Sequence, residues 1–187
     1  VPRDYEEIER LRDVIMEKDQ VIERLQACLR QTTHDMREEI EQLVDALATA
    51  GLIGAVVATR ASLSGSEVGC QAETGAAAGM AAGAATEMLG GSPSMVGHAV
   101  ALAQQGTLGL VCDPLGGLVE LPCVFRNATG AAIALAAVEM AMAGITFAIP
   151  ADEVIDTMGE IGKEMDVRYP LVVDNEEFRP SESDTRL

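Results

Sequence analysis

The sequence predicts an all-α protein: an Ala/Gly-rich helical domain with long loops, preceded by an amphipathic helix with a heptad-like pattern. Two features of the composition favour this class. Apolar residues make up 48% of the 187 residues, yet aromatic residues make up only 3% and tryptophan is absent. Alanine, glycine, leucine, valine and methionine must therefore fill the core. Small residues let helices approach closely, whereas β-branched and aromatic residues are typical of sheets.

An uneven distribution of charge is the third observation. Residues 1–45 carry 7 basic and 13 acidic side chains, residues 46–150 carry 2 and 6, and residues 151–187 carry 4 and 11. We therefore expect an amphipathic helical segment over 1–45, a domain over 46–168, and an acidic, flexible tail over 169–187. The formal charge of −17 disfavours nucleic acid and anionic membranes as partners, because both need a basic face.

The first helix is expected over residues 4–47, either as one long helix or as a helical hairpin. The apolar residues of its heptad pattern are Ile8, Ile15, Ile22, Leu29 and Met36 at one position and Leu11 and Leu25 three residues further on. Lys18, Thr32 and Glu39 occupy the remaining sites of that second position, so the pattern decays. Two interpretations stay open, a dimerisation arm and an amphipathic helix lying on the core.

Glycine, proline and capping residues divide the rest of the chain into helices and loops. Helices are expected over Ala46–Thr59 (interrupted by Gly51 and Gly54), Glu73–Leu89, Ser94–Gln105, Asn127–Ala143 and from Pro150 to about Met165. Loops are expected over Arg60–Gly69 and Leu108–Pro122. Ser92 can cap the third of these helices with Pro93 at its first position, and Gly144 can stop the fourth.

The same sequence predicts a soluble, cytoplasmic protein. Its longest uncharged apolar runs, Ala46–Thr59 and Thr74–Thr86, have 14 and 13 residues, whereas a membrane span needs about 20. The start is charged and lacks the apolar region of a signal peptide. Four cysteines without a secretion signal indicate a reducing compartment, where metal binding or catalysis is commoner than disulfides.

Three cysteines are candidate metal ligands: Cys70, Cys112 and Cys123, each in a segment that contains glycine or proline. Thiolates select zinc or an iron–sulfur cluster, and three of them would leave one iron of a [4Fe–4S] cluster open as a Lewis acid. Two alternatives remain open. Because no short C-x-x-C pair is present, the three can be inert core cysteines, or they can form a zinc site with His98.

Two segments resemble a known family. Arg60–Gly75, with its Gly-Cys-Gln-Ala-Glu run, is similar to a loop of the iron–sulfur L-serine dehydratases, and Gly109–Ala128 is similar to that family's second and third cysteine region. The resemblance covers about Glu41–Met165, the C-terminal part of the family's α chain. It implies that Cys70, Cys112 and Cys123 bind a [4Fe–4S] cluster and that the fourth iron binds L-serine, which is deaminated to pyruvate and ammonia.

Two of the family's substrate motifs are not found in this sequence, an Ala-Pro-Thr-Ala-Gly-type loop and a Ser-rich motif. We therefore expect catalysis to need a missing segment, a β-type partner chain or domain, or a homo-oligomer. The alternative function is a non-catalytic iron–sulfur or zinc protein that associates through its N-terminal helix.

Candidate substrate-binding residues flank the cysteines: Ser62, Ser64, Glu73, Arg126 and Asn127. Each has a structural alternative. The serines can be loop hydroxyls or caps, and Glu73 can be an acid in the first turn of its helix. Arg126 can pair with Asp113 or Glu120 instead of a substrate carboxylate, and Asn127 can cap the helix after it. Cys28 is expected to be a helix-packing residue, and the general base is not identified.

Overall fold

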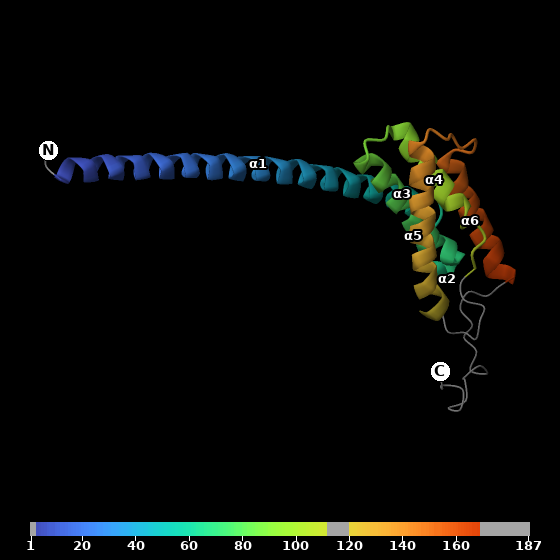
Figure 1. The fold of residues 1–187 in the computed structure, drawn as a ribbon. Helices are drawn as coiled ribbons and strands as arrows, with labels where there is room; N and C mark the ends of the chain where they lie inside the picture. Colours follow the sequence, from blue (N-terminus) through green and yellow to red (C-terminus); the bar gives the residue numbers. More distant parts are fainter. Residues whose placement is uncertain (1–2, 112–119, 169–187) are drawn as a thin grey trace, which may run out of the picture. The chain divides into compact units, whose positions relative to one another are not determined.

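The computed structural model describes the backbone of residues 3–111 and 120–168 (Figure 1). Every regular element in these ranges is a helix, which confirms the predicted all-α class. The elements are α1 (Arg3–Arg60), α2 (Gly65–Val68), the π-helix η1 (Gln71–Gly75), α3 (Ala76–Met88), α4 (Pro93–Gln105), α5 (Glu120–Met142) and α6 (Ala151–Arg168).

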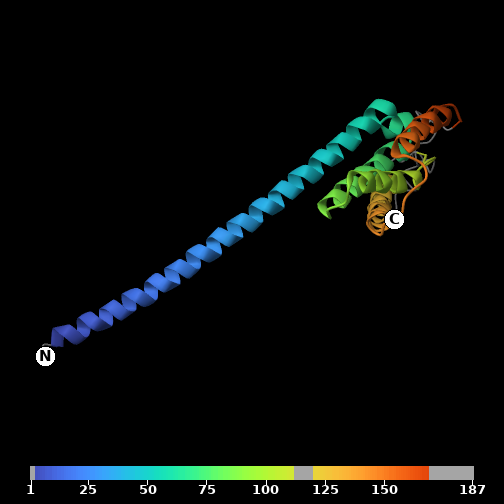
Figure 2. The ribbon, with the colours of Figure 1, turned by 90° about the horizontal axis from the view of Figure 1, so that it is seen from above.

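Helix α1 is one continuous helix of 58 residues, so the hairpin alternative is wrong (Figure 2). Its residues belong to two compact units of the chain, Val1–Leu43 and Val44–Leu187. The predicted interruption at Gly51 and Gly54 is also wrong, because a glycine costs a helix only about 1 kcal/mol relative to alanine. A Cβ on Gly54 would lie 3.0 Å from Met80 Cε, so this glycine serves close packing. The three-part division by charge stays a prediction.

The core of the second unit is built from alanines on α3, α4 and α5, which lie together in both ribbon views. The buried residues of this core are Ala78, Ala82, Ala99, Leu102, Ala103, Ala134, Ala137, Val138 and Ala141. Glycine allows a further close approach, since a Cβ on Gly79 would lie 2.8 Å from Gln104 Cγ. Packing between helices through alanine and glycine is therefore confirmed.

A smaller core attaches α6 to the last turns of α1. Val57, Ala76, Ile155 and Met158 are almost fully buried and contact one another. At the rim of this core, the Arg60 guanidinium donates to both carboxylate oxygens of Asp156, at 2.8 and 2.6 Å. This exposed pair lowers the pKa of Asp156 through its hydrogen bonds, and it stabilises the contact between α6 and the end of α1.

Two predicted helix boundaries are confirmed. Ser92 Oγ accepts the backbone N–H of Met95 at 3.4 Å, and Pro93 is the first residue of α4. Gly144 ends α5 with φ +83°, its N–H bonds to the carbonyl of Ala141, and the next N–H bonds to the carbonyl of Met140. This pair of bonds is the Schellman arrangement that the glycine predicts.

Two other boundaries differ from the prediction. The expected loop Arg60–Gly69 contains the short helix α2. Helix α5 begins at Glu120 instead of near Asn127, so Cys123 lies on a helix and not in a loop. Pro122 suggested irregular structure, but proline is tolerated in the first turn of a helix, where its missing N–H has no partner to lose. The predicted tail 169–187 lies outside the described residues.

By length and composition alone, two helices are long and apolar enough to cross a membrane. They are α1, within Tyr5–Arg60, and α5, within Cys123–Met142. The uncharged runs of the sequence are shorter, whereas each of these helices contains an 18-residue window with no more than two charged residues. Core helices of soluble proteins have the same length and composition, so the cytoplasmic location stays a prediction.

Candidate metal centre

Two free thiols that are 53 residues apart in the sequence meet in the second unit. Cys70 lies at the N-terminus of η1 and Cys123 lies in the first turn of α5. Their Sγ atoms are 3.2 Å apart, which is hydrogen-bonding contact and well beyond the length of a disulfide, about 2.05 Å. Cys70 is fully buried and Cys123 is half-buried. The site is therefore a reduced thiol pair at the edge of the core.

Arg126 is the cation beside this pair. It lies three residues after Cys123 and so projects from nearly the same face of α5. Its Nη1 donates to Cys70 Sγ at 3.3 Å and to the carbonyl oxygen of Val111 at 2.8 Å. Burial raises the pKa of the Cys70 thiol most, its hydrogen bond with Cys123 raises it further, and Arg126 opposes both effects. A bound cation would favour the thiolate form and so oppose this upward shift of the pKa.

Glu73 adds a carboxylate to the site. Its oxygen and the two Sγ atoms all lie within 4.8 Å of one another, and its side chain is exposed. The backbone N–H of Gly65 donates to Glu73 Oε1 at 3.1 Å. A Cβ on Gly65 would lie 2.7 Å from that oxygen, so the glycine lets the backbone reach the carboxylate. The described donors are thus two thiols and one carboxylate oxygen, a set that suits a soft or borderline cation.

Glycines allow η1 and α5, the two helices beside the thiol pair, to converge on the site. Gly69, directly before Cys70, has φ +82°, and a Cβ there would lie 2.8 Å from the carbonyl oxygen of Leu110. A Cβ on Gly130 would lie 2.7 Å from Thr74 Cγ2, so this glycine lets α5 approach η1. The close backbone contacts bring Cys70 and Cys123 together.

Gln71 fixes the backbone around Cys70, and the sequence analysis missed it. The side chain is fully buried. Its Nε2 donates to the carbonyl of Met158 at 3.0 Å, and its Oε1 accepts the N–H of Gly109 at 2.9 Å. The same residue's backbone N–H bonds to the carbonyl of Leu110 at 3.1 Å. In the sequence, Gln71 stands out only as a long polar residue next to the candidate ligand Cys70.

The third candidate ligand, Cys112, lies outside the described residues, as does Asp113. Cys112 directly follows Val111, whose carbonyl is held by Arg126. The side chain of Glu120 also lies outside the described part, so the alternative ion pairs of Arg126 are untested. The described bonds of Arg126 go to Cys70 and Val111.

The remaining candidate residues are placed as follows. Ser62 donates to the Glu67 carboxylate and accepts the N–H of Ser64 at 3.0 Å, and its role in substrate binding stays a prediction. Ser64 is the residue before α2, and its carbonyl accepts the N–H groups of Glu67 and Val68. Asn127 is exposed in the interior of α5 and does not cap it, because the helix begins at Glu120.

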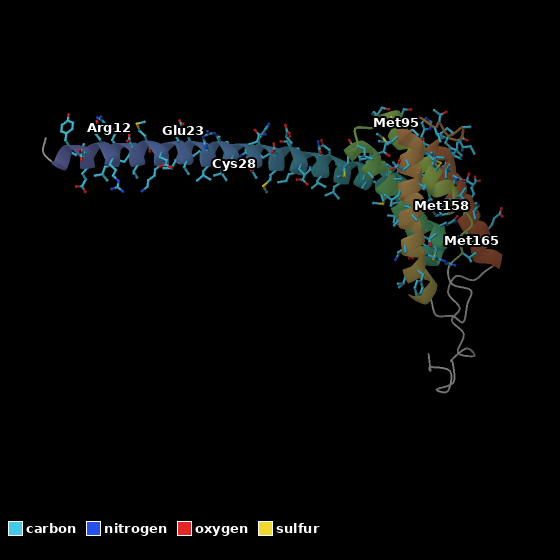
Figure 3. All side chains as sticks on the ribbon, in the orientation of Figure 1. Arg12, Glu23, Cys28, Met95, Met158 and Met165 are labelled. Carbon is cyan, nitrogen blue, oxygen red and sulfur yellow. The ribbon has the colours of Figure 1, made fainter. Side chains whose placement is uncertain are left out.

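Two further residues lie apart from the group of possible metal ligands. His98 Nδ1 accepts the backbone N–H of Phe147 at 3.3 Å, and the described ligand group contains no histidine. The zinc site that included His98 is therefore not formed in residues 3–111 and 120–168. Cys28 is exposed on α1 (Figure 3).

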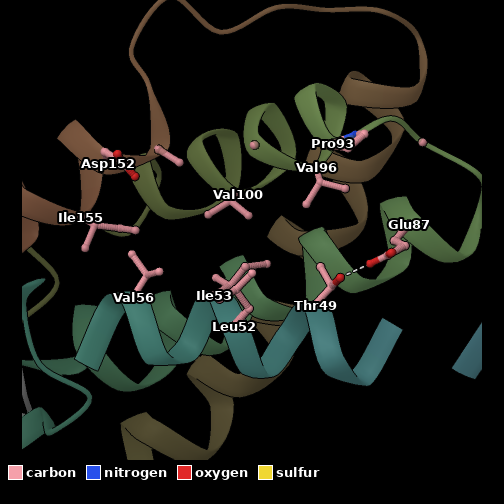
Figure 4. A pocket seen from close by; sticks show the side chains of 13 residues that line it. Thr49, Leu52, Ile53, Val56, Glu87, Pro93, Val96, Val100, Asp152 and Ile155 are labelled. Carbon is pink, nitrogen blue, oxygen red and sulfur yellow. Dashed lines mark hydrogen bonds between the residues drawn. The ribbon is translucent and has the colours of Figure 1, made fainter. Parts of the chain in front are cut away.

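An apolar cavity of about 360 Å³ lies elsewhere in the second unit, between α1, α4 and the start of α6 (Figure 4). Leu52, Val56, Val96, Val100 and Ile155 line it, and Thr49 donates to the Glu87 carboxylate at one end. None of Cys70, Glu73 and Cys123 lines this cavity. The thiol pair and the cavity are separate features.

Fold and site together define a class of protein: a helical, Ala/Gly-packed domain with a paired-thiol site suited to a soft metal. Comparison of the sequence with protein families gives the particular family. The model of the serine dehydratase alpha chain matches residues 21–172. This chain belongs to the serine dehydratase alpha chain family.

Individual relatives agree with this assignment. A probable L-serine dehydratase alpha chain of Bacillus subtilis (strain 168) is 57% identical over 125 residues. An L-serine dehydratase of Streptomyces coelicolor is 49% identical over 124 residues, and the L-serine dehydratase alpha chain of Peptoniphilus asaccharolyticus is 48% identical over 113 residues. These alignments cover 67%, 66% and 60% of this chain, but only 42%, 27% and 39% of the relatives. The chain spans less than half the length of each of these three proteins.

Proposed function

We propose that this chain carries the cluster-binding part of an L-serine dehydratase, with a [4Fe–4S] cluster bound by Cys70, Cys112 and Cys123. The observation that carries the proposal is the approach of Cys70 Sγ and Cys123 Sγ to 3.2 Å from two separate elements. It is supported by the similarity to L-serine dehydratases over two-thirds of the chain.

The donor set fits such a cluster. Both described thiols are free and converge on one point, and thiolates are the ligands that iron–sulfur clusters take. Arg126 lies against Cys70 Sγ, where its charge offsets the negative charge of bound thiolates. It also donates to the carbonyl oxygen of Val111, the residue before Cys112 in the sequence.

When bound, the cluster supplies an open iron that acts as a Lewis acid toward the departing hydroxyl of L-serine. The chain's own residues take up the proton and bind the charged groups of the substrate. Glu73 is an exposed carboxylate within 4.8 Å of both described thiols, and we assign it the role of the base that takes the proton from Cα of L-serine. Loss of that proton and of the β-hydroxyl gives aminoacrylate, which tautomerises and is hydrolysed to pyruvate and ammonia.

The substrate pocket of this proposal is completed by polypeptide beyond this chain's described residues. Two of the relatives are named alpha chains, and that naming suits a chain that works with a second one. We therefore include a β-type partner or a second copy in the proposal. A cytoplasmic location is part of it too, because reduced thiols persist in reducing compartments.

The first test is anaerobic purification followed by iron and sulfide analysis. We expect about four irons and four sulfides per chain. Cys123→Ser should lose most of this iron, because two thiolates hold a cluster poorly. The matched control is Cys28→Ser, which removes an exposed cysteine on α1 and should keep the iron content of the parent chain. Equal iron in the parent and in Cys123→Ser would contradict the ligand assignment.

Recording the visible spectrum before and after adding L-serine tests the second half of the proposal. With the partner chain or second copy present, a serine-induced change that D-serine does not produce is the expected result. Four irons without any response to L-serine in that assembly would leave the cluster assignment in place and contradict substrate binding at the open iron.

One observation favours a second candidate function. Cys70, Glu73 and Cys123 by themselves offer two sulfur ligands and one oxygen ligand within 4.8 Å, which suits a single zinc ion in a non-catalytic helical protein. That protein would be colourless, with one zinc and no sulfide per chain. Metal analysis of the same preparation distinguishes the two functions.

A further inference from the structure

Helix α1 has a stripe of apolar side chains that is exposed over the described side chains of the first unit, residues 5–43. The stripe repeats every seven residues. Over residues 8–29 the first core position, a, holds Ile8, Ile15, Ile22 and Leu29, and the second, d, holds Leu11, Lys18 and Leu25. Ile15 is 57% exposed and Leu25 is 64% exposed. A lone helix with this much exposed aliphatic surface is a helix that lacks its partner.

We propose that the partner is a second copy of this chain, bound as an antiparallel two-stranded coiled coil over residues 4–29. Residues 4–20 of this segment precede residue 21, where the family match begins, so the proposal goes beyond the dehydratase function. In the best register, Ile8 faces Leu25 of the other copy, Leu11 faces Ile22, and Ile15 faces Lys18. The two-fold axis then passes between Met16 and Glu17.

The residues beside the core select the antiparallel orientation. In an antiparallel pair the g positions face each other, and so do the e positions. Val14 and Val21, both at g, then pack together across the interface, and both are at least 40% exposed in the single chain. Arg12 and Asp19, both at e, then form an ion pair that the two-fold axis repeats. At the centre of the interface, each flanking pair therefore joins either two apolar side chains or one basic and one acidic side chain.

A parallel, in-register pair is less favourable for the same residues. Lys18 would face Lys18 of the other copy in the core, which places like charges together. Val14 would lie beside Asp19, and Val21 beside Gln26, so both valines would contact polar side chains. Only Glu7 and Arg12 would form an opposite-charge pair. Charge complementarity therefore favours the antiparallel register.

Cys28 provides a direct test of the register, because it is exposed and lies at a g position (Figure 3). In the proposed pair it faces Glu7 of the other copy. The variant Glu7→Cys in the otherwise native chain should therefore be linked from position 7 to position 28 of its partner by a short bismaleimide. Positions 7 and 28 of one helix are about 31 Å apart, so the link can join only two copies. Peptide mapping by mass spectrometry identifies the linked positions.

The control is Glu9→Cys, which places a thiol on the polar face and should give at least tenfold less linkage to Cys28. The parallel alternative is tested with Ile22→Cys in a Cys28→Ser background, where only a parallel pair brings the two new thiols together. Sedimentation of the unmodified chain should show a dimer. Self-linkage at position 22, or a monomer at all concentrations, would overturn the proposal.

Discussion

At the scale of single residues, two buried glutamines differ in whether their side-chain amides have hydrogen-bond partners. Gln71 is fully buried, and its side chain bonds to the carbonyl of Met158 and to the N–H of Gly109. Gln104 is 1% exposed, and within the described part of the chain neither its Nε2 nor its Oε1 has a partner. A buried amide with two partners stabilises the fold, whereas one without partners costs free energy of desolvation.

Replacing each glutamine with methionine should therefore change stability in opposite directions. Methionine has a similar length and fills irregular space. Gln71→Met removes both side-chain hydrogen bonds from a fully buried position and should lower the free energy of unfolding by about 1–3 kcal/mol. Gln104→Met should raise it by about 1 kcal/mol. Urea denaturation followed by circular dichroism measures both, and a stabilised Gln71→Met would contradict the assigned role.

Glu73 can be a base or a ligand, and one substitution distinguishes the roles. Glu73→Gln removes the proton acceptor but leaves all cysteines in place. We expect unchanged iron and sulfide content, and at least a hundredfold lower rate of pyruvate formation once the missing part of the enzyme is supplied.

Glu67→Gln is the matched control for this substitution. Glu67 is another carboxylate of the same region, and it accepts a hydrogen bond from Ser62 instead of lying beside the thiols. Its replacement should leave the rate within a few-fold of the parent. Loss of iron from Glu73→Gln would show that the carboxylate is a ligand and not the base.

At the scale of whole elements, the end of α5 depends on one backbone conformation. Gly144 has φ +83°, which residues with a Cβ adopt at a cost of about 1–2 kcal/mol. Gly97 lies inside α4, and a Cβ there would meet nothing within 4 Å. Glycine is thus required at the first position and only tolerated at the second.

The expected result is that Gly144→Ala lowers the free energy of unfolding by about 1 kcal/mol, because alanine must take the left-handed conformation. Gly97→Ala should raise it by about 0.5–1 kcal/mol, because alanine favours the helix and fits without contact. Thermal unfolding of the two variants beside the parent checks both signs. A Gly144→Ala variant as stable as the parent would mean that the last turn of α5 rearranges freely.

The elements that sequence predicted well are those set by local chemistry. Ser92 with Pro93 and the glycine at 144 are capping signals within a few residues of the boundary they determine, and both are observed. The start of α5 was missed because Pro122 is compatible with either a loop or a first helical turn. The pairing of Cys70 with Cys123 could not come from spacing, since it depends on how η1 and α5 pack. The resemblance of the flanking motifs supplied that expectation instead.

At the scale of the whole molecule, negative charge dominates, with a formal charge of −17. Arg60 is one of only two cations between residues 46 and 150. It joins the end of α1 to the start of α6 through Asp156 and also lies 3.1 Å from Asp152. An isolated cation among acids stabilises the fold by offsetting their repulsion, and salt screens this contribution.

The contribution of this ion pair should depend on pH in a defined direction. Arg60 lowers the pKa of Asp156 in the folded state below the unfolded value of about 3.9. The stabilisation is therefore fully present above that value and is lost as the pH falls through the lower folded value, where Asp156 becomes protonated. We expect Asp156→Asn to be less stable than the parent from about pH 5 to 7, with the difference closing below about pH 4.

Glu153→Gln is the control for this prediction, since Glu153 is an exposed acid of the same turn that forms none of the ion pairs of Arg60. The difference in stability between Glu153→Gln and the parent should not shrink in the same way below about pH 4. Thermal midpoints are measured at several pH values, at low salt and again in 1 M sodium chloride. They separate the contribution of the Arg60–Asp156 pair to stability from that of the general repulsion among acidic side chains. A different result would contradict this account. If the parent became more stable relative to Asp156→Asn as the pH fell, the protonated form of Asp156, and not its ion pair with Arg60, would be the stabilising form.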